Sequence, residues 1–269
     1  KGKCFDTMLA HYLLFPDQRH NMDVLAENFL NYSPVSITEL IGKGTKQKNM
    51  GDISPDEVSD YACEDADITL QLKEIFEPLL KESKVDKLFE EIEIPLFDVL
   101  SDIERNGVKL NKDALAELSK NLEKDALEEQ EEIFKIAGTE FNIASPKQLG
   151  IILFDELKLS DKAKKTKTGQ YATGEEVLSR LAGEHEIAER ILRFREYQKL
   201  RSTYVDALPK MVSPIDNKIH TDYNQAVAAT GRLSSNNPNL QNIPVRTERG
   251  REIRKAFISE PDSIIVSID

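Results

Sequence analysis

Two carboxylates and a tyrosine near the N-terminus have the types and spacing that metal-assisted hydrolysis requires. Tyr61 and Asp65 are four residues apart in a segment of helical periodicity, so we expect them to share one helix face. Asp6 lies in another segment of helical periodicity. Carboxylates suit Mg²⁺, and a tyrosine hydroxyl beside a carboxylate can orient a water that cuts a phosphodiester. A core tyrosine and a solvated aspartate would give the same pattern.

A second set of residues could bind phosphates. The segment 187–204 has helical periodicity and carries five cations, Arg190, Arg193, Arg195, Lys199 and Arg201. The chain has a net charge of -12, but residues 190–257 hold 13 Lys and Arg against 6 Asp and Glu. A local basic strip sets the field at a groove, so the overall acidity does not exclude a nucleic-acid ligand. The alternative is an ordinary solvated helix face.

The stretch "ATGRLSSNNPNLQNIP" at 229–244 is rich in groups that donate and accept directed hydrogen bonds. Its one cation is Arg232, and its amides include Asn239, Gln241 and Asn242. Such side chains reach base edges, sugars and phosphates. Asn-Asn-Pro-Asn is also strong turn chemistry, so an Asn-rich turn is the alternative.

The last residues, "SIIVSID", alternate apolar and polar and predict a buried strand that ends at Asp269. An acid at a strand end on a nucleic-acid surface could hold a metal ion, and it could equally be a simple cap. The chain begins at Lys1 rather than at a methionine and stops inside this strand. We therefore expect an internal fragment of a longer protein.

The periodicity of the chain predicts a mainly helical protein with a mixed C-terminal part. Ser54, Pro55 and Glu57 form a helix-start signal, and Gly138 a helix end. No apolar run reaches the roughly 18 residues of a membrane span, and the two cysteines fit no metal motif or disulfide framework. We expect helices over 4–15, 21–32, 54–83, 86–105, 111–138, 146–157 and 185–212, then extended segments.

Five motifs then appear in an order that closely resembles bacterial DNA polymerase I, of DNA polymerase family A. They are "FDTMLAHYLL", "YACEDADITLQL", "QKLRSTYVDALP", "KIHTDYNQAVAATGRLSSNNPNLQNIPVRTERGREIRKAFI" and "SIIVSID". The resemblance covers nearly the whole chain. The "TGRLSSNNPNLQNIP" block is specific to that family, whereas the Tyr61–Asp65 block is shared with other proofreading exonucleases.

The resemblance implies a mixed, mainly α chain in three parts. Residues 1–82 would be the C-terminal part of an α/β ribonuclease H-like 3′→5′ exonuclease domain. Residues 83–205 would be a connecting helix and a helical thumb. Residues 206–269 would be the start of an α+β palm, truncated at its first catalytic aspartate.

The resemblance also implies roles for particular residues. Asp6, Tyr61 and Asp65 would belong to the exonuclease site and Asp269 to the polymerase site, with Asp6, Asp65 and Asp269 as Mg²⁺ ligands. Arg232 would contact the primer terminus from the minor groove. The remaining DNA contacts would be Arg195, Lys199, Asn239, Gln241, Asn242 and Arg246.

The implied function is DNA synthesis with proofreading in replication and repair, by two-metal-ion nucleotidyl transfer. The implied partners are primer–template DNA and dNTP, and no membrane is involved. The protein would be a monomer in the bacterial cytoplasm, at the nucleoid. Two alternatives are a stand-alone 3′→5′ exonuclease and a non-catalytic DNA-binding module. A stand-alone exonuclease would not need a thumb-like hairpin or the "TGRLSS" block. A DNA-binding module is how the isolated fragment could behave.

We predict that the 269-residue chain alone neither extends primers nor excises nucleotides at a meaningful rate. The paired acids that begin the family's exonuclease site would precede Lys1, and the second catalytic aspartate would follow Asp269. Primer-extension and excision assays on the purified chain check this. Robust extension by the isolated chain would contradict it.

Overall fold

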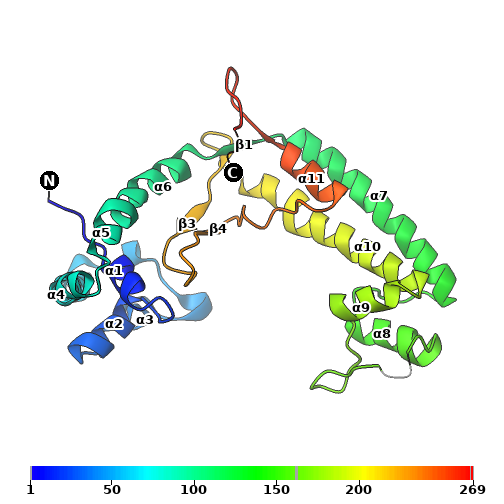
Figure 1. The fold of residues 1–269 in the computed structure, drawn as a ribbon, viewed down its shortest axis with the longest axis horizontal. Coiled ribbons are helices and arrows are strands. Elements are labelled where there is room, and N and C mark those ends of the chain that lie inside the picture. Colours follow the sequence, from blue (N-terminus) through cyan, green and yellow to red (C-terminus); the bar gives the residue numbers. More distant parts are fainter. Residues whose placement is uncertain (1, 161–162, 267, 269) are drawn as a thin grey trace. The chain divides into compact units, whose positions relative to one another are not determined.

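A computed structural model describes residues 2–160, 163–266 and 268. Contacts divide the chain into two compact units (Figure 1). The first unit comprises Lys1–Asn106 and Thr221–Gln241, and the second comprises Gly107–His220 and Asn242–Asp269. The expectation of a mainly helical chain is confirmed. None of the described helices is long and apolar enough to cross a lipid bilayer.

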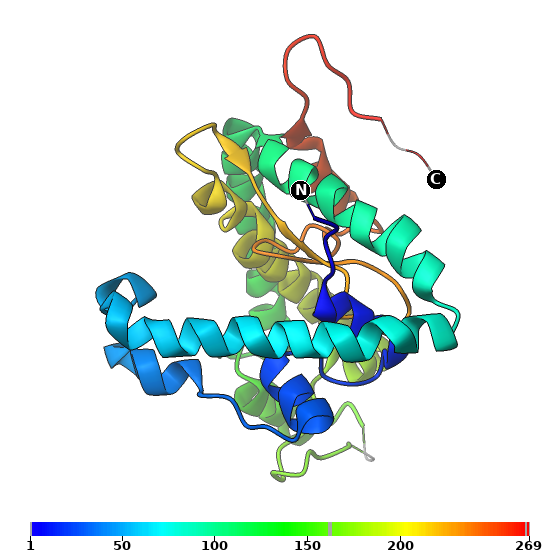
Figure 2. The ribbon, with the colours of Figure 1, turned by 90° about the vertical axis from the view of Figure 1, so that its left-hand side faces the viewer.

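The first unit is organised around the long helix α4 (Pro55–Glu82). Ser54 and Glu57 form the predicted capping box, and Pro55 occupies the first turn, where it costs no backbone hydrogen bond. Figure 2 shows this helix in cyan, with blue α1 (Thr7–Leu14) and α2 (Met22–Leu25) beside it. The unit also contains η1 (Ala26–Leu30), α3 (Ile37–Ile41), η2 (Gly44–Lys46), η3 (Met50–Asp52), α5 (Asp86–Leu88), η4 (Phe89–Glu93) and α6 (Ile94–Asn106).

The core of the first unit is a stripe of α4 packed on α1. Ile68, Leu72, Phe76 and Leu80 recur every four residues and are almost completely buried. They pack with Leu9 and Ala10 of α1. Residues 221–241 complete this unit with the antiparallel pair β3 (Asp222–Asn224) and β4 (Ser234–Asn236).

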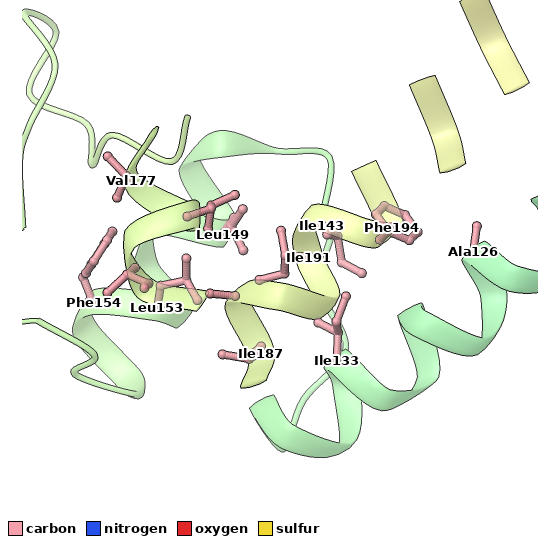
Figure 3. Close-up of a cluster of buried hydrophobic side chains, with 13 residues drawn as sticks. Ala126, Ile133, Ile143, Leu149, Leu153, Phe154, Val177, Ile187, Ile191 and Phe194 are labelled. Atoms are coloured by element: carbon pink, nitrogen blue, oxygen red, sulfur yellow. The ribbon is translucent and has the colours of Figure 1, made fainter. Parts of the chain in front are cut away.

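The second unit is built on a pair of long helices, α7 (Lys112–Ala137) and α10 (Glu186–Leu200). Asn111 caps the start of α7, and Gly138 ends it in the left-handed conformation at φ +72, as the sequence predicts. Buried side chains from α7, α10 and the segment between them form its core (Figure 3). This intervening segment contains α8 (Pro146–Ile151), η5 (Ile152–Glu156) and α9 (Glu175–Ala182).

The described strands of the second unit form a small antiparallel sheet in the order β2-β1-β5. The central strand β1 (Val108–Leu110) pairs with β2 (Lys218–Ile219) and β5 (Phe257–Ile258). The remaining elements are η6 (Arg201–Val205), η7 (Leu208–Met211) and α11 (Glu248–Lys255), which is capped by Thr247. The sequence patterns did not predict α11.

The strand expected over "SIIVSID" is wrong for the described residues of that segment. Residues 263–266 and 268 form no strand, and Ile264, Ile265, Val266 and Ile268 are exposed. Backbone N–H and C=O groups of a strand need a neighbouring strand to pair with. No described strand pairs with these residues, so their apolar alternation has no sheet to join.

His11 of α1 is a polar group inside the first core. It is fully buried, and the rings of Phe15, Phe29 and Phe76 lie around it with centroids 5.0 to 5.6 Å away. Its Nδ1 is 2.8 Å from Nδ1 of His20. Burial, and then the nearby His20, lower the pKa of His11 to about 4 because both disfavour the cation.

We therefore predict that acid destabilises the first unit through His11. Between pH 6.5 and pH 4 the unfolded chain binds a proton at His11 that the folded chain does not bind. The free energy of unfolding is therefore unaffected by protonation of His11 above this window and falls as the pH is lowered through it. The loss is about 3 kcal/mol at pH 4. Urea unfolding at several pH values, compared with His11→Leu, measures it. Equal pH slopes in the two proteins would contradict the assignment.

Candidate functional site

The first predicted site lies where α1 and α4 pack together. Asp6 is half-buried and caps α1, with its Oδ1 accepting a hydrogen bond from the Leu9 N–H at 2.9 Å. Tyr61 and Asp65 lie one turn apart on α4, and both are half-buried. The structure thus places the three predicted residues on two packed helices of one unit.

The surroundings of Tyr61 keep its hydroxyl protonated. Burial, followed by the negative charge of Asp65, raises the pKa of Tyr61 above its ordinary value. Asp65 Oδ1 is buried and has no hydrogen-bond partner among the described residues. A buried carboxylate oxygen without a partner is costly, and a cation or a donor from a ligand would satisfy it.

The described residues supply only part of a metal site. No group of three or more His, Cys, Asp or Glu side chains within 2–160, 163–266 and 268 could together hold a metal ion. The unpartnered Asp65 oxygen fits an oxygen ligand of a hard cation such as Mg²⁺, and Asp6 caps the helix that packs against α4. A hydrated Mg²⁺ held by one or two carboxylates is consistent with this partial set.

A groove lies beside Tyr61, between α4 and the segment around α3. Its volume is about 250 Å³. Glu64, in its wall, accepts hydrogen bonds from the Tyr32 hydroxyl and from the Val35 N–H. The other lining residues are Glu39, Leu40, Glu57 and Asp60. Sequence patterns did not predict this groove, because 29 to 32 residues separate Glu64 from its two donors.

The predicted minor-groove stretch begins with a turn and the strand β4 in the first unit, while its last residues, 242–244, belong to the second unit. Gly231 has φ +76, a conformation that favours glycine, and its N–H donates to the Ala228 carbonyl at 3.2 Å. Arg232 follows directly, is exposed, and makes no ion pair or hydrogen bond among the described residues. Its guanidinium is therefore available to a ligand.

Asn239 and Gln241 also hold the loop itself. Asn239 Oδ1 accepts a hydrogen bond from the Gln241 N–H, and Gln241 Nε2 donates to the Leu233 carbonyl, each at 3.0 Å. Both side chains are exposed. The turn chemistry that we considered as an alternative is therefore present, and it does not engage the side chain of Arg232 among the described residues.

In the second unit, the basic stripe of α10 is largely neutralised. Arg190 and Arg193 contact Glu129 of α7 at 3.1 and 2.6 Å, and Arg201 contacts Glu123 at 2.8 Å. These three cations are thus paired with acidic side chains of α7, which is consistent with the alternative of an ordinary helix face. The two other cations of the stripe, Arg195 and Lys199, make no ion pair among the described residues.

Those two cations differ in their surroundings. Arg195 donates to the buried carbonyl of Thr173 and lines a groove of about 920 Å³, whose wall includes Tyr171 and Phe194. Burial lowers the pKa of Arg195. Lys199 is exposed and has no ion-pair partner among the described residues.

The last three predicted positions lie near the end of the chain. Asn242 is exposed, and its carbonyl accepts from the Tyr204 hydroxyl at 2.6 Å. Arg246 is exposed. Asp269 lies outside the described residues, so the structure does not place it.

Comparison with known proteins identifies both halves of the chain. The sequence model for DNA polymerase family A matches residues 112–269, and the model for 3′-5′ exonucleases matches residues 2–81. The chain belongs to DNA polymerase family A. The three residues of the α1–α4 site fall within the exonuclease match, and the other predicted positions fall within the polymerase match.

Relatives of this family A chain are bacterial DNA polymerase I proteins. That of Pseudomonas aeruginosa is 42% identical over 272 residues, covering 100% of this chain and 30% of the relative. That of Rhizobium leguminosarum is 43% identical over 266 residues, covering 98% of this chain and 26% of the relative. This chain thus spans less than a third of the length of these relatives.

A solved structure supports the same family. The POL domain of Pol1 from M. smegmatis, in complex with DNA primer-template and dNTP, is 35% identical to this chain with a TM-score of 0.78. The alignment covers 95% of this family A chain and 41% of that chain. The resemblance seen in the sequence motifs is confirmed.

Proposed function

We propose that this chain is a segment of a proofreading DNA-directed DNA polymerase that acts in bacterial DNA replication and repair. The observation that carries the proposal is that one chain matches an exonuclease model over 2–81 and a polymerase model over 112–269. A stand-alone exonuclease would not need the second match. We propose the parts expected from the sequence, with the C-terminal part of an exonuclease domain at 1–82, a connecting helix and thumb at 83–205, and the start of a palm at 206–269. The complete protein would act as a monomer in the cytoplasm, at the nucleoid.

In DNA synthesis, the primer 3′ hydroxyl would attack the α-phosphate of a bound dNTP, and pyrophosphate would leave. Asp269 would hold Mg²⁺ together with a further acid. The bound metal ions would supply charge stabilisation at the attacking and leaving oxygens. Arg195, Lys199, Asn242 and Arg246 would contact the DNA.

The role of the first-unit loop follows from its exposed guanidinium. Every correct base pair presents acceptors in the minor groove at purine N3 or pyrimidine O2. Arg232, with Asn239 and Gln241 nearby in the loop, could donate to such acceptors at the primer terminus. These contacts would test the geometry of the pair without reading its sequence.

For excision, Asp6 and Asp65 would hold a divalent cation, which would activate a water. The Tyr61 hydroxyl, which lies beside Asp65, would help to orient this water. The groove beside Tyr61 provides space next to the site. The unpartnered Asp65 oxygen supports this assignment, because a carboxylate kept for structure alone would have its own donors.

We predict that Asp65→Ala in the complete polymerase lowers 3′→5′ excision at least roughly 100-fold, because a metal ligand is lost, and leaves extension unchanged. Single-turnover excision and extension assays measure both activities. Asp67→Ala is the matched control, since Asp67 is an exposed acid on the same helix whose carboxylate accepts a hydrogen bond from Gln71. Equal losses of excision and extension in Asp65→Ala would count against the assignment.

We predict that Arg232→Ala slows extension of a matched primer roughly 10- to 100-fold, the equivalent of one or two charge-assisted hydrogen bonds. Duplex affinity should change much less, because most of it comes from phosphate contacts. Rapid-quench extension and equilibrium binding measure the two effects. Arg105→Ala, at an exposed arginine of the same unit, is the control. A large loss of affinity with normal extension would make Arg232 a phosphate anchor.

A further inference from the structure

Tyr12, in the last turns of α1, contacts the loop that precedes Arg232. Its side chain is only 4% exposed. Its hydroxyl donates a hydrogen bond to the Ala228 carbonyl at 2.7 Å and accepts one from the Gly231 N–H at 3.1 Å. These residues are more than 200 positions away in the sequence, yet they belong to the same unit.

The two contacted atoms are the two ends of one turn. The Gly231 N–H also points to the Ala228 carbonyl, at 3.2 Å, so a single hydroxyl braces the hydrogen bond that closes the turn. Gly231 has φ +76, and no atom lies within 4 Å of where a Cβ would stand. The turn therefore has no side-chain packing at this glycine, and the hydroxyl of Tyr12 supplies a fixed contact there.

The tyrosine ring is itself held in place. It meets the ring of His20 edge-on, with centroids 5.6 Å apart, and His20 pairs with the buried His11. The neighbouring residues Leu9 and Ala10 are buried against α4. The hydroxyl is thus presented by a rigid helix.

Other contacts anchor the start of this segment but not its turn. Gln225 Nε2 donates to the carbonyl and to the carboxylate of Glu93, at 3.0 and 2.7 Å. The Tyr223 N–H donates to Glu104 at 2.6 Å. The segment would therefore stay attached to the unit without Tyr12, and the specific effect of the tyrosine falls on the turn next to Arg232.

We propose that Tyr12 is a positioning residue that fixes the direction of Arg232 toward the primer terminus. The inference rests on the proposed role of Arg232. Loss of the Tyr12 hydroxyl would let the turn sample other conformations, and the guanidinium would reach the minor-groove acceptors less often. At a mispaired terminus the contact between Arg232 and the minor groove is already poor, so the rate of extension would fall little.

The test is Tyr12→Phe in the complete polymerase, with single-turnover extension of matched and mismatched primer termini. Matched extension should slow about 5- to 10-fold, corresponding to loss of one to two hydrogen bonds. Mismatched extension should change less than about 2-fold, so discrimination between the two falls. Lower stability alone would reduce the amount of active enzyme, and it would therefore affect matched and mismatched extension equally.

Two further variants sharpen the test. Tyr223→Phe is the matched control, because the Tyr223 hydroxyl makes no hydrogen bond among the described residues and lies in the same segment. It should leave the discrimination ratio unchanged. Gly231→Ala disturbs the same turn through its positive φ without substituting any residue of α1, and it should lower the ratio as Tyr12→Phe does.

A double-mutant cycle separates the two proposals. If Tyr12 acts through Arg232, then Tyr12→Phe has no further effect on matched extension in the Arg232→Ala background. Multiplicative effects, or an unchanged ratio in Tyr12→Phe, overturn the positioning role while leaving the proposed function intact. Normal extension by Arg232→Ala alone would overturn the proposed role of Arg232, and the positioning role with it.

Discussion

The burial of one apolar stripe on α4 supports every functional element of the first unit. Ile68, Leu72, Phe76 and Leu80 are each 2% exposed or less. Burying such side chains contributes about 1.5–3 kcal/mol apiece. This packing fixes α1 against α4, and α1 carries Asp6 at its start and Tyr12 near its end. The positions of the Asp6 carboxylate and of the Tyr12 hydroxyl both depend on that contact.

In the second unit, a paired carboxylate lies between the two long helices. The core of this unit is apolar, but Glu129 is mostly buried at the junction of α7 and α10 and meets two arginines there. A carboxylate in that position is costly unless it is paired, so the pairing restricts how the two helices can pack. The same pairing removes Arg190 and Arg193 from the set of cations that could meet a phosphate. The attraction of the second unit for an anionic ligand is therefore weaker than its number of basic residues indicates.

Local chemistry made much of the fold predictable from the sequence. Ser54, Glu57 and Gly138 act on backbone groups within a few residues, and their predicted caps are present. Features that depend on distant partners were not predictable. The bracing of Gly231 by Tyr12 and the pairing of Arg201 with Glu123 join residues far apart in the sequence. The strand expected at 263–269 is not formed by the described residues of that segment, because apolar alternation indicates a strand only where another strand can pair with it.

The contact between Tyr12 and the Ala228–Gly231 turn has a consequence for recombining these proteins. Tyr12 lies in the segment that matches exonucleases, whereas the turn lies in the segment that matches polymerases. A chimera joined between residues 81 and 112 would unite a helix from one parent with a turn from another. Compatibility at this hydroxyl would then affect the turn that precedes Arg232. The boundary suggested by sequence families is thus not an independent structural joint, and graft designs should exchange α1 and residues 221–241 together.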